Sequence, residues 1–403
     1  MEITCAFVAD MVGSETVMRP MADLIERQGH KVLRQFALGK PAKLNRLEVE
    51  SADMLVTGLT SDESRAQSLE IPAITAAWAQ GEKVVGVLDV PDSAGRGATI
   101  FSSVAHMFTM IMVIVKEDVP MARKNFPNAQ VVVVGSPEWE RLALDQTTRS
   151  SVRESIGIDE QKKLVVVPGT KDILVNIPLF QAAITTVAEM AECDSTMQFM
   201  VALALHPGEV LTRKSNLDNI LRQHAFVPNP VMEAAGKDEQ SFYADLLLDQ
   251  YRGSTDEIEK AARGFEGLFS SGAVAVRVFT KKMMPTEKLV VAADALIEYR
   301  STVRVCAGFR KVPVVSYCAG EYARRVSMKN FGMVGYSSWE QGTYFDATDG
   351  SMTKLRSGLG ALLEANNRKA KAMAKTQGEV YIMPKRLGES ADRMANAAIS
   401  LLG

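Results

Sequence analysis

The sequence predicts an α/β protein of two Rossmann-like domains, and three observations carry this prediction. The chain has 403 residues, which exceeds one ordinary hydrophobic core and suits two domains of roughly 150–200 residues each. Short apolar runs alternate with segments of helical periodicity in both halves of the chain. Polar loops follow several apolar runs, and open α/β sheets bind ligands in such loops at the carboxyl ends of their strands. We therefore expect two sheets that face a cleft.

The first half begins as a βαβ unit. Glu2–Ala9 is an apolar run, Glu15–Gln28 carries apolar residues at helical spacing, and His30–Phe36 is the next apolar run. The first loop lacks the GxGxxG spacing of dinucleotide sites, so the sequence does not indicate a dehydrogenase. We expect about six strands in this half, and the others are Asp53–Gly58, Glu82–Leu88, Met112–Lys116 and Gln130–Val134.

The second half repeats the alternation after a linker at Asp145–Arg149. Its expected strands are Lys163–Val167, Met197–Leu205, Val274–Phe279, Ala295–Ile297 and Val314–Tyr317. Its expected helices are Ser151–Ile156, Asn176–Glu192, Glu287–Ala293, Val303–Phe309, Gly350–Lys375 and Ala391–Leu402.

Residues 211–271 are less regular, and we expect helices there at 241–250 and 256–265. The mixed composition of this region is compatible with acceptor-binding loops or with the contact surface of a homodimer. The expected divisions of the chain are a first domain at 1–148, a second domain at 149–380 and a C-terminal helix at 381–403.

Composition and charge narrow the class of protein. The formal net charge of −2, with 46 Lys and Arg against 48 Asp and Glu, provides no extended basic surface for nucleic acid. The most apolar stretch, Val104–Val115, is too short to span a bilayer, and the N-terminus enters a strand without the basic start of a signal peptide. Four scattered cysteines without CxxC spacing indicate reduced thiols in a cytoplasmic protein, and the four histidines form no zinc motif.

The most informative segment joins two short apolar strands of the second half. Ser301 and Thr302 form a polar turn between the strand at 295–297 and the helix at 303–309. A turn that opens a helix presents unpaired N–H groups and the positive end of the helix dipole, which suit a phosphate. Arg300 adds a charge beside the turn that suits bidentate phosphate contact. The alternative is that Ser301 or Thr302 only caps the helix, and the two roles are compatible.

Two other loops of the second half are candidates for contact with a nucleotide or diphosphate. His206 stands at the end of an expected strand, at the carboxyl edge of the sheet, where structural and ligand-binding roles are equally compatible with the pattern. Thr170 and Lys171 follow a glycine in the loop after another strand. Their order is not a P-loop, because the GxxxxGK[ST] spacing is absent.

Three acids lie at the carboxyl ends of expected strands in the first half, namely Asp89, Glu15 and Glu63. An enzyme that activates a hydroxyl group needs one such side chain to remove its proton, so we expect a catalytic base among them. Asp89 is favoured, because it ends a buried strand and opens a polar, glycine-containing loop, although an aspartate there is also a common turn cap. Gly13 and Ser14 are expected to contact a ligand at this edge, or to form only a tight turn.

Three motifs carry a resemblance that covers nearly the whole chain. They are 134–137 (Val-Gly-Ser-Pro), 205–207 (Leu-His-Pro) and the segment from Glu298 through Pro313-Val314. Their order resembles the two-domain GT-B fold of nucleotide-sugar enzymes. Within that fold the chain is most similar to the non-hydrolysing UDP-N-acetylglucosamine 2-epimerases, with some likeness to CDP-glycerol and sialic-acid transferases. The resemblance implies a C-terminal helix that returns to the first domain.

The departures from that family concern its catalytic residues. The Gly-Asp-Thr loop of the epimerases is Gly-Leu-Thr at 58–60, so the catalytic carboxylate is missing. Their His-Arg-Arg-Glu-Asn element is replaced by Pro168–Asp172, and their paired ribose-binding glutamates by Val303–Cys306. Epimerisation needs a base that removes the C2 proton, so these changes disfavour ordinary 2-epimerase activity more than they disfavour nucleotide-sugar binding.

The resemblance therefore implies a metal-independent GT-B glycosyltransferase-like enzyme. Its substrate would be a nucleotide-activated sugar such as a UDP-sugar, with an unidentified acceptor and no tightly bound cofactor. The second domain would bind the nucleotide. The first would bind the acceptor and supply the base, with Gly13 and Ser14 beneath the sugar or acceptor. The alternatives are a nucleotide-sugar epimerase or hydrolase with relocated catalytic groups, and a non-catalytic nucleotide-sugar-binding or scaffold protein.

Overall fold

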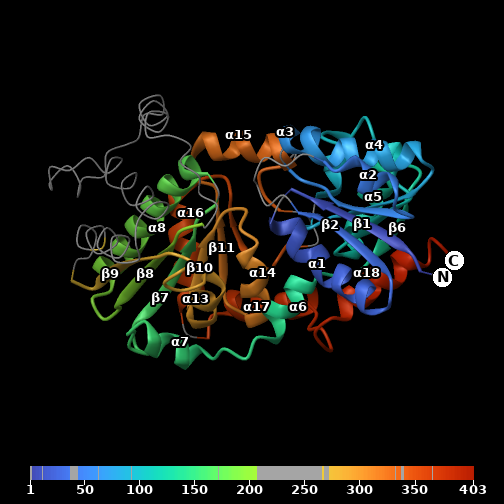
Figure 1. Ribbon diagram of the computed structural model, residues 1–403. Helices are drawn as coiled ribbons and strands as arrows, with labels where there is room; N and C mark the ends of the chain where they lie inside the picture. The colour runs from blue at the N-terminus through green and yellow to red at the C-terminus, as the bar shows by residue number, and fades with distance from the viewer. Residues whose placement is uncertain are drawn as a thin grey trace. The chain divides into compact units, whose positions relative to one another are not determined.

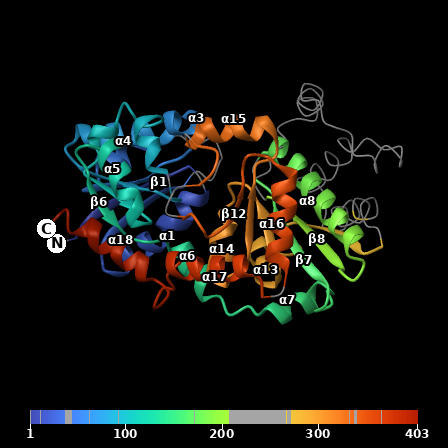
Figure 2. The same ribbon diagram turned by 180° about the vertical axis from the view of Figure 1, so that it is seen from behind.

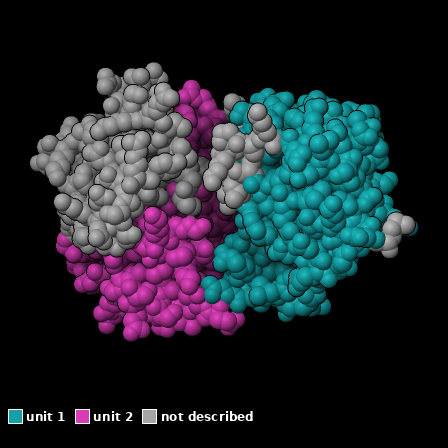
Figure 3. All heavy atoms as spheres, in the orientation of Figure 1, with its two compact units in different colours: residues 1–145, 383–403 teal, residues 146–382 magenta. Residues whose placement is uncertain are grey.

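Two six-stranded parallel sheets, each covered by helices, form the frame of the protein (Figures 1 and 2). The structure is a computed structural model, and the chain divides into two compact units, residues 1–145 with 383–403 and residues 146–382 (Figure 3). The helices expected at 241–250 and 256–265 lie outside the described residues. The described residues are 2–10, 12–36, 44–61, 63–91, 93–170, 172–206, 266, 272–331, 333–336, 340–364 and 366–403.

The sheet of the first unit has the strand order β2-β1-β3-β4-β5-β6, and every neighbouring pair is parallel. Parallel neighbouring strands must be joined by crossover connections, which are usually helices. The sequence therefore alternates between apolar strand runs and segments of helical periodicity. The strands are β1 (Thr4–Ala9), β2 (Lys31–Phe36), β3 (Met54–Gly58), β4 (Lys83–Val87), β5 (Met110–Val113) and β6 (Gln130–Val133).

Both faces of this sheet are buried, so its central strands are apolar at successive positions rather than at alternate ones. Phe7 of β1 packs on one face with α1 and α18, and Val8 packs on the other face with α4. The α-helices of this unit are α1 (Val12–Arg27), α2 (Arg46–Glu50), α3 (Glu63–Arg65), α4 (Ile71–Ala79), α5 (Val119–Asn125), α6 (Pro137–Leu144) and α18 (Glu389–Ile399). Its short helical segments are the π-helix η1 (Ala66–Glu70) and the 3₁₀ turns η2 (Ser93–Ala98), η3 (Ala105–Met107) and η4 (Lys116–Asp118).

The C-terminal helix α18 is held in the first unit by a carboxylate. Glu140 of α6 accepts hydrogen bonds from the N–H groups of Gly388, at 2.9 Å, and Ser390. A carboxylate at the start of a helix satisfies unpaired N–H groups and complements the helix dipole. Arg393 donates to the carbonyl oxygen of Val134, which ties the helix to the end of β6. Figures 1 and 2 show α18 beside α1.

The sheet of the second unit has the order β12-β11-β10-β7-β8-β9, again parallel throughout. Its strands are β7 (Lys163–Pro168), β8 (Phe199–Ala204), β9 (Val274–Phe279), β10 (Ala295–Glu298), β11 (Val314–Tyr317) and β12 (Phe345–Ala347). Its described helices are α7 (Arg149–Ser155), α8 (Ile173–Cys193), α13 (Thr286–Ala292), α14 (Val303–Arg310), α15 (Gly320–Phe331), α16 (Met352–Leu363) and α17 (Arg368–Val380). The face formed by Val165, Ile297 and Val315 packs against α8 and α16.

Two predicted elements were wrong in their bounds. The strand expected at Met112–Lys116 is β5, which starts at Met110 and ends at Val113, because its register with β4 and β6 fixes both ends. The single helix expected at Gly350–Lys375 is divided into α16 and α17. Asn366 has a positive φ of 64°, and the side chain of Asn367 caps α17 by accepting from the Lys369 N–H. No element was predicted where α15 and β12 lie.

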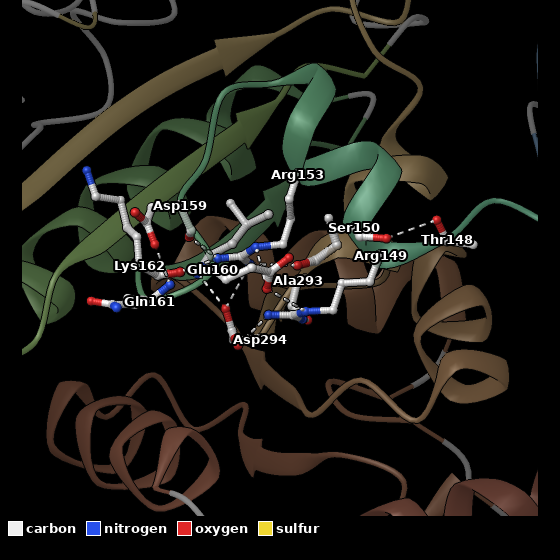
Figure 4. A network of polar contacts seen from close by, with 12 residues as sticks. Thr148, Arg149, Ser150, Arg153, Asp159, Glu160, Gln161, Lys162, Ala293 and Asp294 are labelled. Atoms are coloured by element: carbon white, nitrogen blue, oxygen red, sulfur yellow. Dashed lines mark hydrogen bonds and ion pairs between the residues drawn. The ribbon is translucent and has the colours of Figure 1, made fainter.

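A buried arginine joins α7 to the sheet of the second unit (Figure 4). The Arg153 side chain is 1% exposed, and its guanidinium lies 3.4 Å from Asp294 Oδ2. It also donates to the carbonyl oxygens of Ala292, at 3.1 Å, and Asp159, at 2.6 Å. Asp294 Oδ2 in turn accepts the Leu164 N–H at 2.7 Å, at the edge of β7. The charge is therefore buried beside an opposite charge, with both terminal nitrogens hydrogen-bonded and Nε 3.3 Å from Glu160, which is the condition for tolerating it.

We expect Arg153→Leu to lower the free energy of unfolding by about 3–5 kcal/mol, because it leaves the Asp294 carboxylate and the carbonyl groups of Asp159, Lys162 and Ala292 without their buried partner. The matched control is Arg356→Ala, since Arg356 pairs with Glu189 while both side chains are nearly half exposed. Its loss should stay below about 1 kcal/mol. Urea denaturation of the two variants measures the difference, and equal losses would contradict the role given to Arg153.

Candidate functional site

Gly13, Ser14 and Asp89 lie together at the carboxyl edge of the first sheet. Gly13 and Ser14 are in the first turn of α1, which begins at Val12 and not at Glu15 as expected. A Cβ on Gly13 would lie 2.9 Å from Asp89 Oδ2, so only glycine allows the helix to approach this carboxylate so closely. Ser14 is fully buried, and its Oγ has no hydrogen-bond partner. The loops that follow β1 and β4 therefore meet at this edge.

Asp89 is held by a single arginine. Nη1 of Arg96 lies 2.9 Å from Asp89 Oδ1, and the same nitrogen donates to the carbonyl oxygen of Leu59. The Asp89 and Arg96 side chains are only 9% and 11% exposed. A carboxylate in this setting is charge-compensated and oriented, and the Arg96 contact spans the ends of β3 and β4.

Glu70 also lies at this edge, and it was not predicted from the sequence. It is fully buried at the end of η1 and accepts the Thr60 N–H on Oε2 at 3.0 Å. Burial raises the pKa of Glu70 to about 8, opposed by hydrogen bonds from the N–H groups of Thr60 and Asp10 and by the charge of Arg96. The nearby Asp89 raises it further. Its Oε1 has no partner.

Asp10 was also missed, although it directly follows β1. It is 5% exposed, its Oδ1 has no partner, and its Oδ2 lies 3.8 Å from Arg65 of α3. The only sequence signals for these two acids are an aspartate at the end of a strand and a glutamate, Glu70, within an apolar helix just before Pro72. Unpaired buried oxygens are uncommon in native proteins and call for an explanation at each site.

The other two acids expected here are placed differently. Glu15 is 7% exposed in the first turn of α1, where its carboxylate pairs with Arg19 one turn later. Glu63 is exposed at the start of α3. Neither Glu15 nor Glu63 takes part in the contacts that bring Asp89 to Gly13. Of these three acids, only Asp89 faces Arg96.

In the second unit, a glutamate already occupies the N-terminus of α14. Glu298 ends β10, and its Oε2 accepts the Ser301 N–H at 2.9 Å and the Tyr336 O–H at 2.6 Å. The Ser301 Oγ accepts the Val303 N–H at 3.3 Å, as a helix cap does. Burial raises the pKa of Glu298 above its ordinary value, against the opposing charge of Arg304 and the hydrogen bonds from Tyr336 and Ser301.

The two residues beside Ser301 differ in what they offer a ligand. Thr302 is exposed, and its side chain makes no cap hydrogen bond. Arg300 has a positive φ of 55°, and it donates to Ser327 Oγ at 3.1 Å and to the carbonyl oxygen of Met333 at 2.9 Å. Its guanidinium also lies 5.0 Å from the centre of the Tyr336 ring. A phosphate at this turn would meet the Thr302 hydroxyl and the flank of Arg300.

Arg304, in the first turn of α14, has a structural role. It is 8% exposed and makes a bidentate pair with Glu340, at 2.9 and 2.8 Å. Its guanidinium lies 3.8 Å from the centre of the Tyr336 ring, and Tyr381 donates to Glu340 at 2.9 Å. The charge of Arg304 is therefore paired within the fold and not directed at a ligand.

The loops with Thr170 and His206 lie side by side at the carboxyl edge of the second sheet. The parallel register pairs Pro168 with Ala204, and the Gly169 N–H donates to the Ala204 carbonyl at 2.7 Å. The Thr170 N–H donates to the side chain of Asn176 at 2.6 Å, which fixes the loop at the start of α8. Both Thr170 and His206 are partly exposed. Lys171, the other residue expected here, is not among the described residues.

Two searches of the described residues bear on the class of site. No group of three or more His, Cys, Asp or Glu side chains in the described part of the chain is arranged to hold a metal ion. No described helix is both long and apolar enough to cross a membrane.

Comparison with solved structures identifies the fold. A structure of S. aureus MnaA with UDP aligns with TM-score 0.57 and 11% identity over 100% of this chain and 97% of that one. A UDP-GlcNAc 2-epimerase of Neisseria meningitidis bound to UDP-GlcNAc aligns with TM-score 0.55 and 10% identity over 99% and 100%. A glycosyltransferase of Rickettsia africae aligns with TM-score 0.51 and 10% identity over 100% and 99%. The expected two-domain GT-B architecture is thus confirmed.

The other two comparisons gave no relatives. No protein-family model matches the sequence, and no curated protein matches it. At 10–11% identity the structural likeness establishes the fold, whereas function has to be argued from the site.

We expect Gly58→Ala to destabilise the first unit by about 1–3 kcal/mol, because the new Cβ would lie 2.4 Å from the Ser14 Cβ in a closely packed edge. Gly95→Ala is the control, since a Cβ there meets only the Met121 Sδ at 3.9 Å. Its free energy of unfolding should change by less than about 0.5 kcal/mol. Comparable losses in the two variants, measured in urea, would contradict the close packing of Ser14 on the end of β3.

Proposed function

We propose that this protein is a metal-independent GT-B enzyme that acts on a nucleotide-activated sugar. The observation that carries the proposal is the whole-chain likeness of its fold to structures that hold UDP and UDP-GlcNAc. The carboxyl edge of the second sheet supports it, because Thr302, Thr170 and His206 are at least partly exposed there. We assign nucleotide binding to this edge, with Ser301, Arg300 and Lys171 as the neighbouring contacts.

Glycosyl transfer is the activity we favour. It needs a base that removes a proton from the acceptor hydroxyl and groups that stabilise the departing phosphate. We assign the base to Asp89 and the acceptor contact to Gly13 and Ser14. This assignment rests on their meeting at one edge of the first sheet, where Asp89 is nearly buried and oriented by Arg96.

Epimerisation or hydrolysis of a nucleotide sugar is the second candidate. It is favoured by the likeness to MnaA and to the Neisseria meningitidis 2-epimerase, whose TM-scores of 0.57 and 0.55 exceed the 0.51 of the Rickettsia africae glycosyltransferase. Against it stands the Leu59 that replaces the catalytic aspartate of the epimerases. The two candidates differ in whether an acceptor is required.

We expect one of UDP, CMP, CDP, GDP and dTDP to raise the melting temperature by several degrees, because a ligand at 100 times its Kd adds about 2.7 kcal/mol to native stability. Differential scanning fluorimetry of the wild type provides the measurement. The double substitution Ser301→Ala with Thr302→Ala should weaken that nucleotide's affinity about tenfold, whereas Ser357→Ala, on an exposed face of α16, should leave it unchanged. Equal affinities for the two variants would contradict the assignment of nucleotide binding to the start of α14. No response to any nucleotide would favour the scaffold alternative.

We expect the nucleotide sugar of the responsive class to persist when incubated with the enzyme alone and to be consumed when an acceptor is added. NMR of the sugar anomeric and C2 protons follows both outcomes. Solvent deuterium at C2, or free sugar, in the absence of acceptor would instead establish the epimerase or hydrolase.

A further inference from the structure

The segment that joins α17 to α18 places large apolar side chains in solvent. In residues 382–387 (Ile-Met-Pro-Lys-Arg-Leu), Ile382 is 77% exposed, Met383 is 52% exposed and Leu387 is 62% exposed. Nine large apolar side chains are exposed in the described part of the chain, and these three lie within six consecutive positions. Six residues span at most about 20 Å, so the three side chains share one small area of the surface. Exposed apolar groups that are gathered rather than scattered indicate a contact surface.

The segment is fixed at both of its ends. Tyr381, directly before it, is 4% exposed and donates a hydrogen bond to Glu340 at 2.9 Å. A Cβ on Gly308 would lie 2.1 Å from the Tyr381 ring, so the ring packs directly on the backbone of α14. Gly388, directly after the segment, donates its N–H to Glu140 at 2.9 Å. The exposed apolar side chains therefore belong to a segment with two anchored ends and not to a fraying terminus.

Basic side chains accompany the apolar ones. Residues 368–393 contain seven basic and three acidic residues, although the chain as a whole has a formal net charge of −2. Each of the three acidic residues is paired with a cation, namely Glu379 with Lys375, Glu389 with Arg393 and Asp392 with Arg386. Lys385, within the segment, is exposed and makes no ion pair with a described residue. The segment therefore carries an excess of positive charge.

Two further lysines extend this positive charge along α17. The Cε of Lys311 lies 3.7 Å from the position that a Cβ on Gly378 would take, so Lys311 lies beside the last turn of the helix. Lys371 precedes Gly378 by two helical turns and is therefore on the same face of α17. Both lysines are exposed, and neither makes an ion pair with a described residue.

Aliphatic side chains interspersed with lysine and arginine fit the interface of an anionic bilayer. The apolar side chains enter the acyl boundary, while the charged ends of Lys385 and Arg386 reach the headgroup phosphates. Nucleic acid fits less well, because residues 382–387 contain no aromatic ring on which a base could stack. A second copy of the chain in a symmetric dimer is disfavoured, since it would place this segment against itself and its own positive charge.

We propose that residues 382–387, with Lys311 and Lys371, form a docking surface for an anionic lipid bilayer. The attachment is peripheral and reversible, because only three large apolar side chains enter the bilayer and a few cations contact its headgroups. It involves no step of the reaction on a nucleotide sugar, so it stands or falls independently of the function proposed above.

Binding of the full-length protein to vesicles tests the proposal. Vesicles of phosphatidylcholine mixed with phosphatidylglycerol are compared with vesicles of phosphatidylcholine alone, and the bound protein is measured by sedimentation. The wild type should bind the anionic vesicles about tenfold more tightly, and added salt should weaken this binding, because exposed charges are screened. No binding to the anionic vesicles, or equal binding to both kinds, would overturn the proposal.

Substitutions in the segment test which residues dock. Ile382→Gln with Leu387→Gln should weaken binding to the anionic vesicles about tenfold, because it removes apolar surface that enters the bilayer. Lys385→Gln should weaken it about fivefold, through the loss of one charge near the headgroups. The matched controls are Leu47→Gln and Lys116→Gln, since the Leu47 residue is 78% exposed on α2 and the Lys116 side chain is 84% exposed in η4. Both controls should bind like the wild type.

All four variants replace exposed side chains, so their melting temperatures should match that of the wild type, which separates docking from damage to the fold. Equal binding by the segment variants and the controls would assign vesicle binding to another surface and overturn the proposal. Light scattering after size-exclusion chromatography tests for a second copy of the chain. A dimer that Ile382→Gln with Leu387→Gln abolishes would identify that copy as the occupant of the segment and would also overturn the lipid assignment.

Discussion

The burial of both faces of each sheet is the constraint on which the rest of the structure depends. Because helices cover the strands on either side, polar chemistry is confined to the strand ends, and each unit gathers its polar side chains at the carboxyl edge of its sheet. Asp10 and Asp89 follow β1 and β4 in the first unit, and Glu298 ends β10 in the second. These side chains are nearly or fully buried at the edge, so each needs a donor or a cation nearby.

The two units meet that need in different ways. In the second unit, Arg304 is committed to Glu340 through two hydrogen bonds, and Glu298 is bound separately by the Ser301 N–H and the Tyr336 hydroxyl. The charge of Arg304 also opposes the rise in the pKa of Glu298 that burial causes. In the first unit, Arg96 pairs with Asp89 and Arg65 lies 3.8 Å from Asp10, while Glu70 accepts the Thr60 N–H.

Much of the frame could be predicted from the sequence, because parallel strands buried on both faces leave continuous apolar runs. β4 and β11 were placed within a residue or two for this reason. Strand bounds that depend on pairing with neighbouring strands were harder to predict, as β5 shows. The break between α16 and α17 was also not predicted, because it depends on the left-handed conformation of Asn366.

The candidate site was predictable only in part. The position of Asp89 at the end of a strand made it a candidate, whereas the close approach of Gly13 to Asp89 came only from the structure. Nothing in the sequence distinguishes Glu70 among 48 acidic residues, because its importance comes from a π-helical turn that carries it under two loops distant in sequence. The same limitation applies to Arg304, whose neighbours on the chain suggest a phosphate site while its partner Glu340 lies 36 residues away.

The unpaired oxygens at the first edge indicate where the chemistry belongs. Ser14 Oγ, Asp10 Oδ1 and Glu70 Oε1 are buried without partners around the Asp89 and Arg96 pair. Leaving a buried polar group without a hydrogen-bond partner costs stability, typically about 1–3 kcal/mol for each group. Such a loss is retained where it serves a function. Oxygens without a partner can accept hydrogen bonds from hydroxyl groups, so the hydroxyls of an acceptor or a sugar are the ligand chemistry that fits this edge.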